Sequence, residues 1–459
     1  MKMRFFVCLA VVVVFFMSCD TQMSNKYKNP DMVRLITLDP GHFHAALVQK
    51  TMYENVDPLV HVYAPAGQDV QLHLDRINAY NTRPVNPTKW DSKVYIGSGF
   101  FEKMLDEKAG NAVVISGNNQ KKTEYIVKAL KAGFNVFADK PMAINTADFE
   151  VLRRAFETAQ NKGLILYDMM TERFEIATIL QKEFSMLLEV FGTLEKGTPD
   201  NPAVTKESVH HFYKYVSGEV LTRPAWFFDV TKEGEGLVDV TTHLVDLIQW
   251  ECFPGRILDY KKDILIDSAR HWTTDLTLSE FKEVTKQEQF PEFLQKDVTD
   301  NILKIYSNGE LNYRLCGVHA KISVKWAYKA PEGAGDTHYS IMRGTKANLI
   351  IRQGAEQQYK PTLYIEPVAE AASYERTLME QIKKIQVKYP GVELKKISRG
   401  WEVAVPEKYR EGHEAHFARV TENFLEYLKN SNMPKWEVPN MIAKYYTTTK
   451  ALELAKAAK

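Results

Sequence analysis

Short apolar blocks alternate with polar, helix-like segments along the first third of the chain. The apolar blocks are bounded by Gly, Pro or Asn, as is typical of buried strands, and occupy residues 33–39, 59–64, 112–116, 135–138 and 164–167. The segments with helical spacing are residues 43–52, 123–132 and 146–160. Strands that alternate with helices predict an α/β fold with a doubly wound, Rossmann-type parallel sheet, whose ligand lies beyond the carboxyl ends of the strands.

The pattern changes after about residue 205. Long strand-like stretches at residues 311–328 and 338–353 are separated by turns, and two helical patterns at residues 413–430 and 438–458 end the chain. This pattern predicts an α+β domain with an open, mainly antiparallel sheet. We therefore expect a nucleotide-binding domain at residues 33–170 and a substrate and oligomerisation domain at residues 171–459.

The N-terminus has the order of an export signal. Lys2 and Arg4 precede an apolar run that is too short to span a membrane comfortably, and the run ends in Ser18-Cys19. The ending resembles the lipobox of bacterial lipoproteins, in which the cysteine is lipidated after cleavage. We expect residues 1–18 to be a signal peptide, Cys19 to carry a lipid, residues 19–32 to be a polar tether, and the protein to lie at the membrane in a bacterial cell envelope. An ordinary secretory signal with a chance cysteine is the alternative.

Charge and cysteine content limit the possible binding partners and disulfides. Without Lys2 and Arg4 the 59 basic residues become 57 against 58 acidic ones, a formal charge of −1, which argues against a nucleic-acid partner. Of four cysteines only Cys252 and Cys316 remain beyond position 19, and their separation favours independent buried thiols.

The tripeptide Asp139-Lys140-Pro141 is the strongest chemical signal, because it directly follows the apolar block at residues 135–138. A lysine at the carboxyl end of a central strand can bind a substrate hydroxyl or stabilise a developing alkoxide. Taken alone, the tripeptide is more often a surface turn. Its context, from Val113 to Pro141, resembles the central segment of the glucose-fructose oxidoreductase and inositol dehydrogenase family (Gfo/Idh/MocA), in which the tripeptide is usually Glu-Lys-Pro.

A second segment resembles the same family. Trp226-Phe227-Phe228-Asp229 is followed by a glycine-containing turn and then by Asp239, His243 and Asp246. We expect these last three residues on one face of a helix, where a carboxylate orients the imidazole. The resemblance implies that His243 is the acid/base and Asp239 a substrate-binding or orienting group. A core histidine is the alternative for this spacing in isolation.

The nucleotide loop departs from the family pattern. Asp39-Pro40-Gly41-His42-Phe43-His44 stands where G-x-G-x-x-G is usual, and Ala64-Pro65-Ala66 stands where an acid usually holds the ribose. The loop can still bind phosphate through backbone N–H groups. The resemblance implies NAD as the cofactor, with NADP left open. The implied cofactor-binding residues are Gly41, His42, Phe43, His44, Asn118, Asp139 and Lys140.

His42-x-His44 after a strand also allows a rival interpretation, since metal-dependent amidohydrolases place H-x-H after the first strand of a (β/α)8 barrel. That fold needs further ligands at later strand ends, and His210, His211 and His271 do not cleanly follow apolar runs. We therefore assign no metal ligand and expect His42 and His44 in the cofactor loop or the substrate pocket.

Weaker candidates lie near the expected site. Arg173 follows the last strand of the first domain, where family members place an Arg-Phe that joins the domains. His210, His211 and Tyr213 are candidates for a sugar pocket, and the aromatic run at residues 226–228 is a candidate for stacking on a sugar face. Ordinary packing explains each of them equally well.

The resemblance implies hydride transfer between a sugar, glycoside or polyol hydroxyl and NAD(P), with Lys140, His243 and Asp239 as catalytic residues and a homo-oligomer as the assembly. Two further functions stay open: an NAD-dependent glycosidase that oxidises and eliminates, and a non-catalytic sugar-binding lipoprotein. Export favours a tightly bound cofactor, because an exported enzyme meets no substantial free dinucleotide pool.

Overall fold

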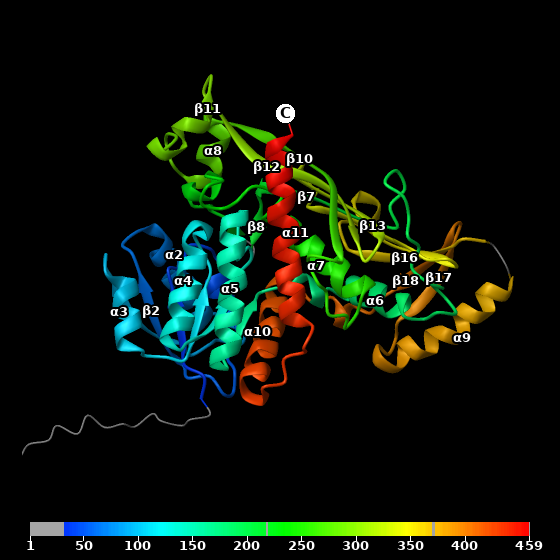
Figure 1. Ribbon diagram of the computed structural model, residues 1–459, viewed down its shortest axis with the longest axis horizontal. Helices are drawn as coiled ribbons and strands as arrows, with labels where there is room; N and C mark the ends of the chain where they lie inside the picture. The colour runs from blue at the N-terminus through cyan, green and yellow to red at the C-terminus, as the bar shows by residue number, and fades with distance from the viewer. Residues whose placement is uncertain (1–31, 217–218, 370–371, 459) are drawn as a thin grey trace, which may run out of the picture.

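The computed structural model describes residues 32–216, 219–369 and 372–458, arranged as two lobes with helix α11 between them (Figure 1). The expected signal peptide, Cys19 and all but the last residue of the expected tether lie outside the described residues. Within the described ranges, no helix combines the length and apolar character needed to cross a membrane.

The first lobe is the predicted Rossmann-type domain. Its six-stranded sheet is parallel throughout, in the order β3-β2-β1-β4-β5-β6. The strands are β1 (Leu35–Leu38), β2 (Leu59–Ala64), β3 (Asp91–Ile96), β4 (Ala112–Ile115), β5 (Asn135–Ala138) and β6 (Leu166–Asp168). Every residue of β1 and β4 is buried, which explains their continuous apolar runs.

Helices connect these strands, and polar and glycine residues set their ends. They are α1 (His44–Leu47), α2 (Gln68–Thr82), α3 (Phe100–Glu107), α4 (Asn119–Ala132) and α5 (Thr146–Lys162). Asn118 and Asn145 accept hydrogen bonds from the first turns of α4 and α5, and left-handed Gly133 and Gly163 end them.

One predicted helix is much shorter than expected. Residues 43–52 have helical spacing, but α1 has only four residues, because the backbone bonds of Gln49 and Lys50 reach only three residues back, to Ala46 and Leu47. Spacing alone could not show where this first turn ends.

The second lobe contains the predicted open sheet, which has ten strands and is mainly antiparallel, with β13 and β7 as its one parallel pair among the described residues. Its strands are β7 (Val204–Tyr213), β10 (Ile264–Thr277), β11 (Val298–Thr299), β12 (Ile302–Leu315), β13 (Val318–Lys329), β14 (Thr337–Arg343), β15 (Ala347–Gln353), β16 (Thr362–Pro367), β17 (Glu393–Ile397) and β18 (Gly400–Ala404). A separate small hairpin pairs β8 (Tyr215–Val216) with β9 (Glu219–Val220).

Helices and short 3-10 turns complete this part of the chain. The helices are α6 (Ile176–Ser185), α7 (Thr241–Cys252), α8 (Leu278–Thr285), α9 (Ala372–Lys388), α10 (His413–Asn430) and α11 (Glu437–Ala457), and the 3-10 turns are η1 (Glu172–Phe174), η2 (Ala225–Phe228), η3 (Glu292–Asp297), η4 (Ala355–Gln357) and η5 (Glu407–Tyr409). The free thiols of Cys252 and Cys316 do not pair with each other.

The end of the chain returns to the first lobe. Phe417, Val420 and Phe424 of α10 belong to the same apolar core as the parallel sheet, and the Phe424 ring stacks on Phe137 of β5 with 4.6 Å between centroids. Helix α10 therefore buries its apolar face against the nucleotide-type domain and brings its first residues to the carboxyl edge of the sheet (Figure 1).

Candidate active site

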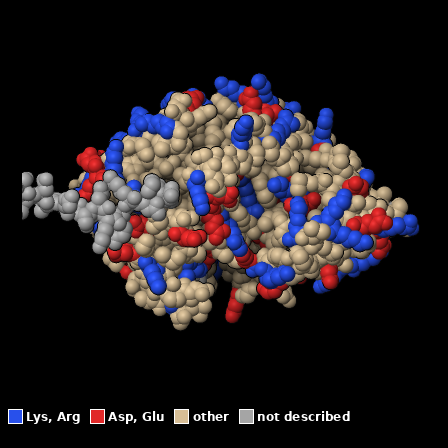
Figure 2. Space-filling model, turned by 90° about the horizontal axis from the view of Figure 1, so that it is seen from below, with Lys and Arg blue, Asp and Glu red and all other residues tan. Residues whose placement is uncertain are grey.

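A cavity of about 690 Å³ lies at the carboxyl edge of the parallel sheet, where ligands of doubly wound folds bind. The first domain contributes His42, His44 and Lys140 to its wall, the second contributes His243, and His413 comes from the start of α10. Basic and acidic side chains are interspersed on the face of the molecule shown in Figure 2. The cavity combines several imidazoles with groups of both charges.

Lys140 projects into this cavity from the end of β5, as the sequence predicts. Its ammonium group donates to the carboxylate of Asp239 and forms an ion pair with it, joining the two domains. Burial by itself lowers the pKa of Lys140, but the carboxylates of Asp239 and Asp139 outweigh it, so the pKa is raised above its ordinary value. Lys140 therefore stays charged at neutral pH.

The expected arrangement around His243 is wrong in its details. Helix α7 begins at Thr241, so Asp239 lies in the preceding turn and its carboxylate is engaged with Lys140. Asp246 is on α7 but accepts from Arg173 and Lys444, and His243 Nδ1 has no hydrogen-bond partner among the described residues. The charged lysine and arginine side chains bind both of the carboxylates that the sequence spacing had predicted to orient the imidazole.

His243 nevertheless lines the cavity beside Lys140. Burial, followed by the nearby charge of Lys140, lowers the pKa of His243 well below its ordinary value. The imidazole is therefore neutral at pH 7 and able to accept a proton.

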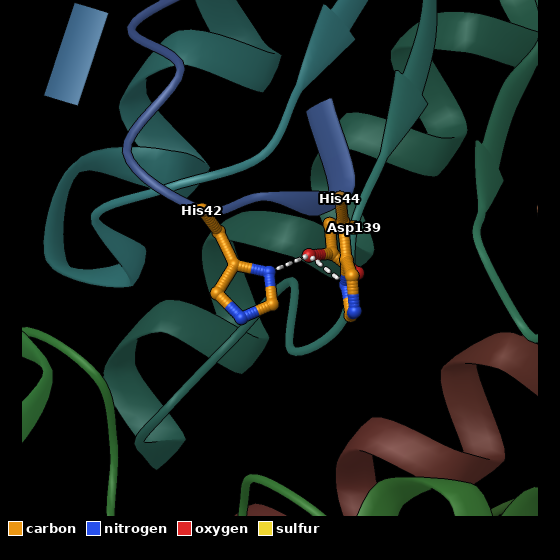
Figure 3. A group of neighbouring side chains, drawn as sticks. All are labelled: His42, His44 and Asp139. Carbon is orange, nitrogen blue, oxygen red and sulfur yellow. Dashed lines mark hydrogen bonds and ion pairs between the residues drawn. The ribbon is translucent and has the colours of Figure 1, made fainter. Parts of the chain in front are cut away.

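His42, in the loop after β1, and His44, the first residue of α1, meet Asp139 at the end of β5 (Figure 3). His44 Nδ1 donates to Asp139 Oδ2 at 2.8 Å, and His42 Nδ1 lies 3.4 Å from the same oxygen. His44 stands where the family pattern has its third glycine, and its ring packs on Phe417 of α10 with 4.5 Å between centroids. Asp139 is buried, so the tripeptide Asp139-Lys140-Pro141 is not a surface turn.

The loop after β1 packs closely on neighbouring segments although it lacks two of the three glycines of the family pattern. Asp39, at the first glycine position, has a left-handed φ of 47°. A Cβ on Gly41 would lie 3.0 Å from Trp226 Cζ2, and a Cβ on Gly117 would lie 2.6 Å from the carbonyl oxygen of Asp39. The two loops thus touch backbone to backbone, and a side chain at Gly117 would force them apart.

Two backbone N–H groups at the start of α1 bear on whether the site fits NAD. In the part of the chain that the structure describes, the amide N–H groups of Phe43 and His44 have no hydrogen-bond acceptor. They are available to a phosphate. The residues present fit NAD, although Asn118 uses its side chain to cap α4 and Asp69 accepts from Trp226 Nε1 at 2.8 Å.

Sequence reasoning missed several residues of the site. Glu233 lines the cavity from the turn before α7, and its Oε2 accepts from Asn119 Nδ2 at 3.1 Å. Burial, followed by the charge of Asp239, raises the pKa of Glu233 well above its ordinary value. Arg223 and His413 also line the cavity. The position of Glu233 directly before Gly234 in the resembling segment was the one available signal.

The weaker candidates divide into structural and cavity residues. Arg173 is buried and pairs with Asp246 and Glu437, so it links η1 to α7 and α11. His210 and Phe227 line the cavity. Both His210 and His211 pair with Asp336, and Trp226 covers Gly41. Tyr213 is not part of the cavity wall.

Family models cover both domains. Residues 41–167 match the model described as "Oxidoreductase family, NAD-binding Rossmann fold", and residues 180–456 match "Putative oxidoreductase C terminal domain". The chain belongs to the Gfo/Idh/MocA oxidoreductase family. A comparison with curated proteins gave no match.

Solved Gfo/Idh/MocA-type structures share the whole architecture. A "putative oxidoreductase" from Parabacteroides merdae is 55% identical, with a TM-score of 0.92 over 94% of this chain and 98% of that one. Levoglucosan dehydrogenase with NADH and levoglucosan is 12% identical, with a TM-score of 0.59 over 93% and 98%. GenD2 from gentamicin A biosynthesis, in complex with NAD, is 14% identical, with a TM-score of 0.57 over 94% and 95%. The last two likenesses concern the fold.

Proposed function

We propose that this family member oxidises a hydroxyl group of a sugar, glycoside or polyol by hydride transfer, with NAD(H) as its cofactor. One observation carries the proposal: Lys140 and His243, from different domains, line one cavity at the carboxyl edge of the parallel sheet. The complex of the related fold with NADH and levoglucosan supports a sugar substrate.

Lys140 and His243 have different roles, because the first is charged and the second is neutral. Lys140, held charged by Asp239, donates to the reacting oxygen and stabilises the negative charge that develops on it. His243 is neutral and lines the cavity, so its imidazole can take the hydroxyl proton directly or through a water. Bound NAD+ supplies the acceptor for the hydride that leaves the sugar carbon.

Export, which we also propose from the lipobox, bears on how the cofactor is held. A cofactor bound with an ordinary Michaelis constant of roughly 1 μM to 1 mM would be lost outside the cytoplasm. We therefore propose a cofactor that remains bound and is returned to its starting state on the enzyme, by a second substrate or later in the same cycle.

Glu233 favours a second candidate, the glycosidase that oxidises and then eliminates. Its raised pKa keeps a carboxylic acid in the cavity wall, near the Lys140–Asp239 pair. Such an acid can protonate a departing glycosidic oxygen. Release of the aglycone from a chromogenic glycoside separates this reaction from simple oxidation.

The deciding experiment is to denature the freshly purified protein and measure the nucleotide it releases. We expect close to one NAD(H) per chain, with little change in turnover of a sugar panel when free NAD+ is added. Protein that is empty but strongly activated by added NAD+ would refute the tightly held cofactor. Cofactor-free protein without activity in NAD(P)+ would instead support the sugar-binding lipoprotein.

A further inference from the structure

Two imidazoles of the cavity wall converge on the buried carboxylate of Asp139, an arrangement that hydride transfer does not require. Ligand-type atoms of His42, His44 and Asp139 all lie within 4.8 Å of one another. Figure 3 shows both rings on the same side of the loop after β1, turned toward the Asp139 carboxylate. The two histidines follow β1 and the aspartate follows β5, and these strands lie on either side of β4. The geometry of the sheet therefore sets the separation of the three side chains.

The spacing of these atoms matches a small metal ion. Tetrahedral Zn²⁺ with bonds of roughly 2.0–2.2 Å to nitrogen and oxygen holds its ligand atoms about 3.3 Å apart. His42 Nδ1 lies 3.4 Å from Asp139 Oδ2, and the 2.8 Å from His44 Nδ1 to that oxygen needs to open by about half an ångström.

Unused donor atoms point to a ligand at the same place. His42 Nδ1 and Asp139 Oδ1 are buried and have no hydrogen-bond partner in the described ranges of the chain. A buried polar atom without a partner destabilises the fold, and a cation bound between the two imidazoles would satisfy His42 Nδ1.

A second layer of contacts holds the carboxylate in position. Ser116 Oγ donates to Asp139 Oδ2 at 3.0 Å, and Lys122 Nζ donates to the backbone oxygen of Asp139 at 2.9 Å. Partners of this kind orient the ligands of metal sites. The neighbouring charge of Lys140 opposes a cation, but it is paired with Asp239.

We propose that His42, His44 and Asp139 bind one divalent transition-metal ion of the zinc class. Two imidazole nitrogens and one carboxylate form the ligand set of catalytic metal centres that keep an open position. Because His42 and His44 line the cavity, that position faces the substrate space and suits an oxygen ligand such as a sugar hydroxyl. The site goes beyond the proposed oxidoreductase function and does not depend on it.

Metal titration of the purified protein, after chelation and without nucleotide or sugar, tests the site. Co²⁺ followed by its visible absorption, and Zn²⁺ followed by calorimetry, are expected to bind at one equivalent per chain. His42→Ala and His44→Ala should each weaken binding at least about tenfold, and Ser116→Ala about 10–100-fold. His61→Ala, a half-buried histidine of β2 outside the cavity, is the matched control and should bind like the parent.

Circular dichroism melting of each variant identifies loss of binding through unfolding, and Asp139→Asn, which keeps the side-chain shape, replaces any histidine variant that does not fold. Absence of the single equivalent in the parent, or its survival in both histidine variants, would overturn the site. Neither result depends on turnover, so the metal site and the proposed oxidoreductase can fail separately.

Discussion

Arg173 binds Asp246 through two hydrogen bonds, of 2.6 Å from Nε and 2.7 Å from Nη2, in a buried contact between η1 and α7. Lys444 of α11 donates to the same carboxylate at 2.9 Å. The Coulomb attraction of these two cations holds the pKa of Asp246 far below its ordinary value, despite burial. Three segments distant in sequence thus share one buried charge cluster behind His243.

Removal of the Asp246 carboxylate should destabilise the fold strongly, because Asp246→Ala leaves Arg173 and Lys444 as buried cations with one fewer anion. We expect the free energy of unfolding, measured by urea denaturation, to fall by about 3–5 kcal/mol. Glu157→Ala is the control, since it breaks the more exposed pair with Arg153 and should cost less than about 1 kcal/mol. Equal losses in the two variants would contradict the cluster's role.

Lys140→Ala and His243→Ala should each reduce turnover about a hundredfold or more, because both groups are proposed to act on charge that develops in the transition state. Melting temperatures should change far less than turnover. Lys128→Ala, which alters an exposed lysine of α4, and His61→Ala are controls for the loss of a cation or an imidazole. Near-normal turnover of a parent substrate by both site variants would show that the assignment is wrong.

The buried histidine His73 predicts how stability depends on pH. Burial, then Arg76, lowers its pKa in the folded protein to about 3, and neither ring nitrogen has a partner among the described residues. The unfolded chain binds the proton below about pH 6.5, so this stability is complete above that pH and is lost as the pH falls toward 3.

The matched variant for this effect is His73→Phe, which keeps a ring but cannot bind a proton. Between about pH 7 and pH 5, the free energy of unfolding of the parent should fall by about 2 kcal/mol more than that of the variant. Urea denaturation at the two pH values measures the difference. Parallel losses would mean that His73 is already charged in the folded protein.

A methyl group at Gly117 should separate the two loops of the nucleotide site. The added Cβ would lie 2.6 Å from the Asp39 carbonyl oxygen and 2.7 Å from the Gly41 amide nitrogen, so backbone must shift. We expect Gly117→Ala to lower the free energy of unfolding by about 1–3 kcal/mol and to weaken NAD(H) binding. In Gly99→Ala the Cβ meets nothing within 4 Å, and stability should change by less than about 1 kcal/mol.

Lipidation is a prediction from the sequence, because Cys19 lies outside the described residues. Radiolabelled palmitate should be incorporated in a bacterial host, and Cys19→Ser should abolish the label since the thioether needs that thiol. An exported, soluble and unlabelled parent protein would instead favour an ordinary secretory signal.

Local patterns in the sequence predicted the parallel sheet well. Apolar runs identified β2 and β5 with their observed bounds, and Gly133 and Gly163 marked the ends of α4 and α5. These features depend on neighbouring residues, whose burial and backbone conformation repeat with a fixed period. The same reasoning placed Lys140 at the carboxyl edge of the sheet, because a residue that follows a central parallel strand has no other position.

Sequence alone determined the order of strands and helices, the family resemblance and the location of Lys140 and His243 in the site. Only the tertiary structure decided which charges pair, because the partners of Asp246 lie 73 and 198 residues away and spacing along a helix contains no information about them. The contact of His44 with Asp139 across 95 residues, and the return of α10 to the first core, have the same origin. Ion pairs and packed faces depend on where the fold brings distant segments together. In this protein the two carboxylates expected beside His243 therefore bind Arg173, Lys444 and Lys140 instead.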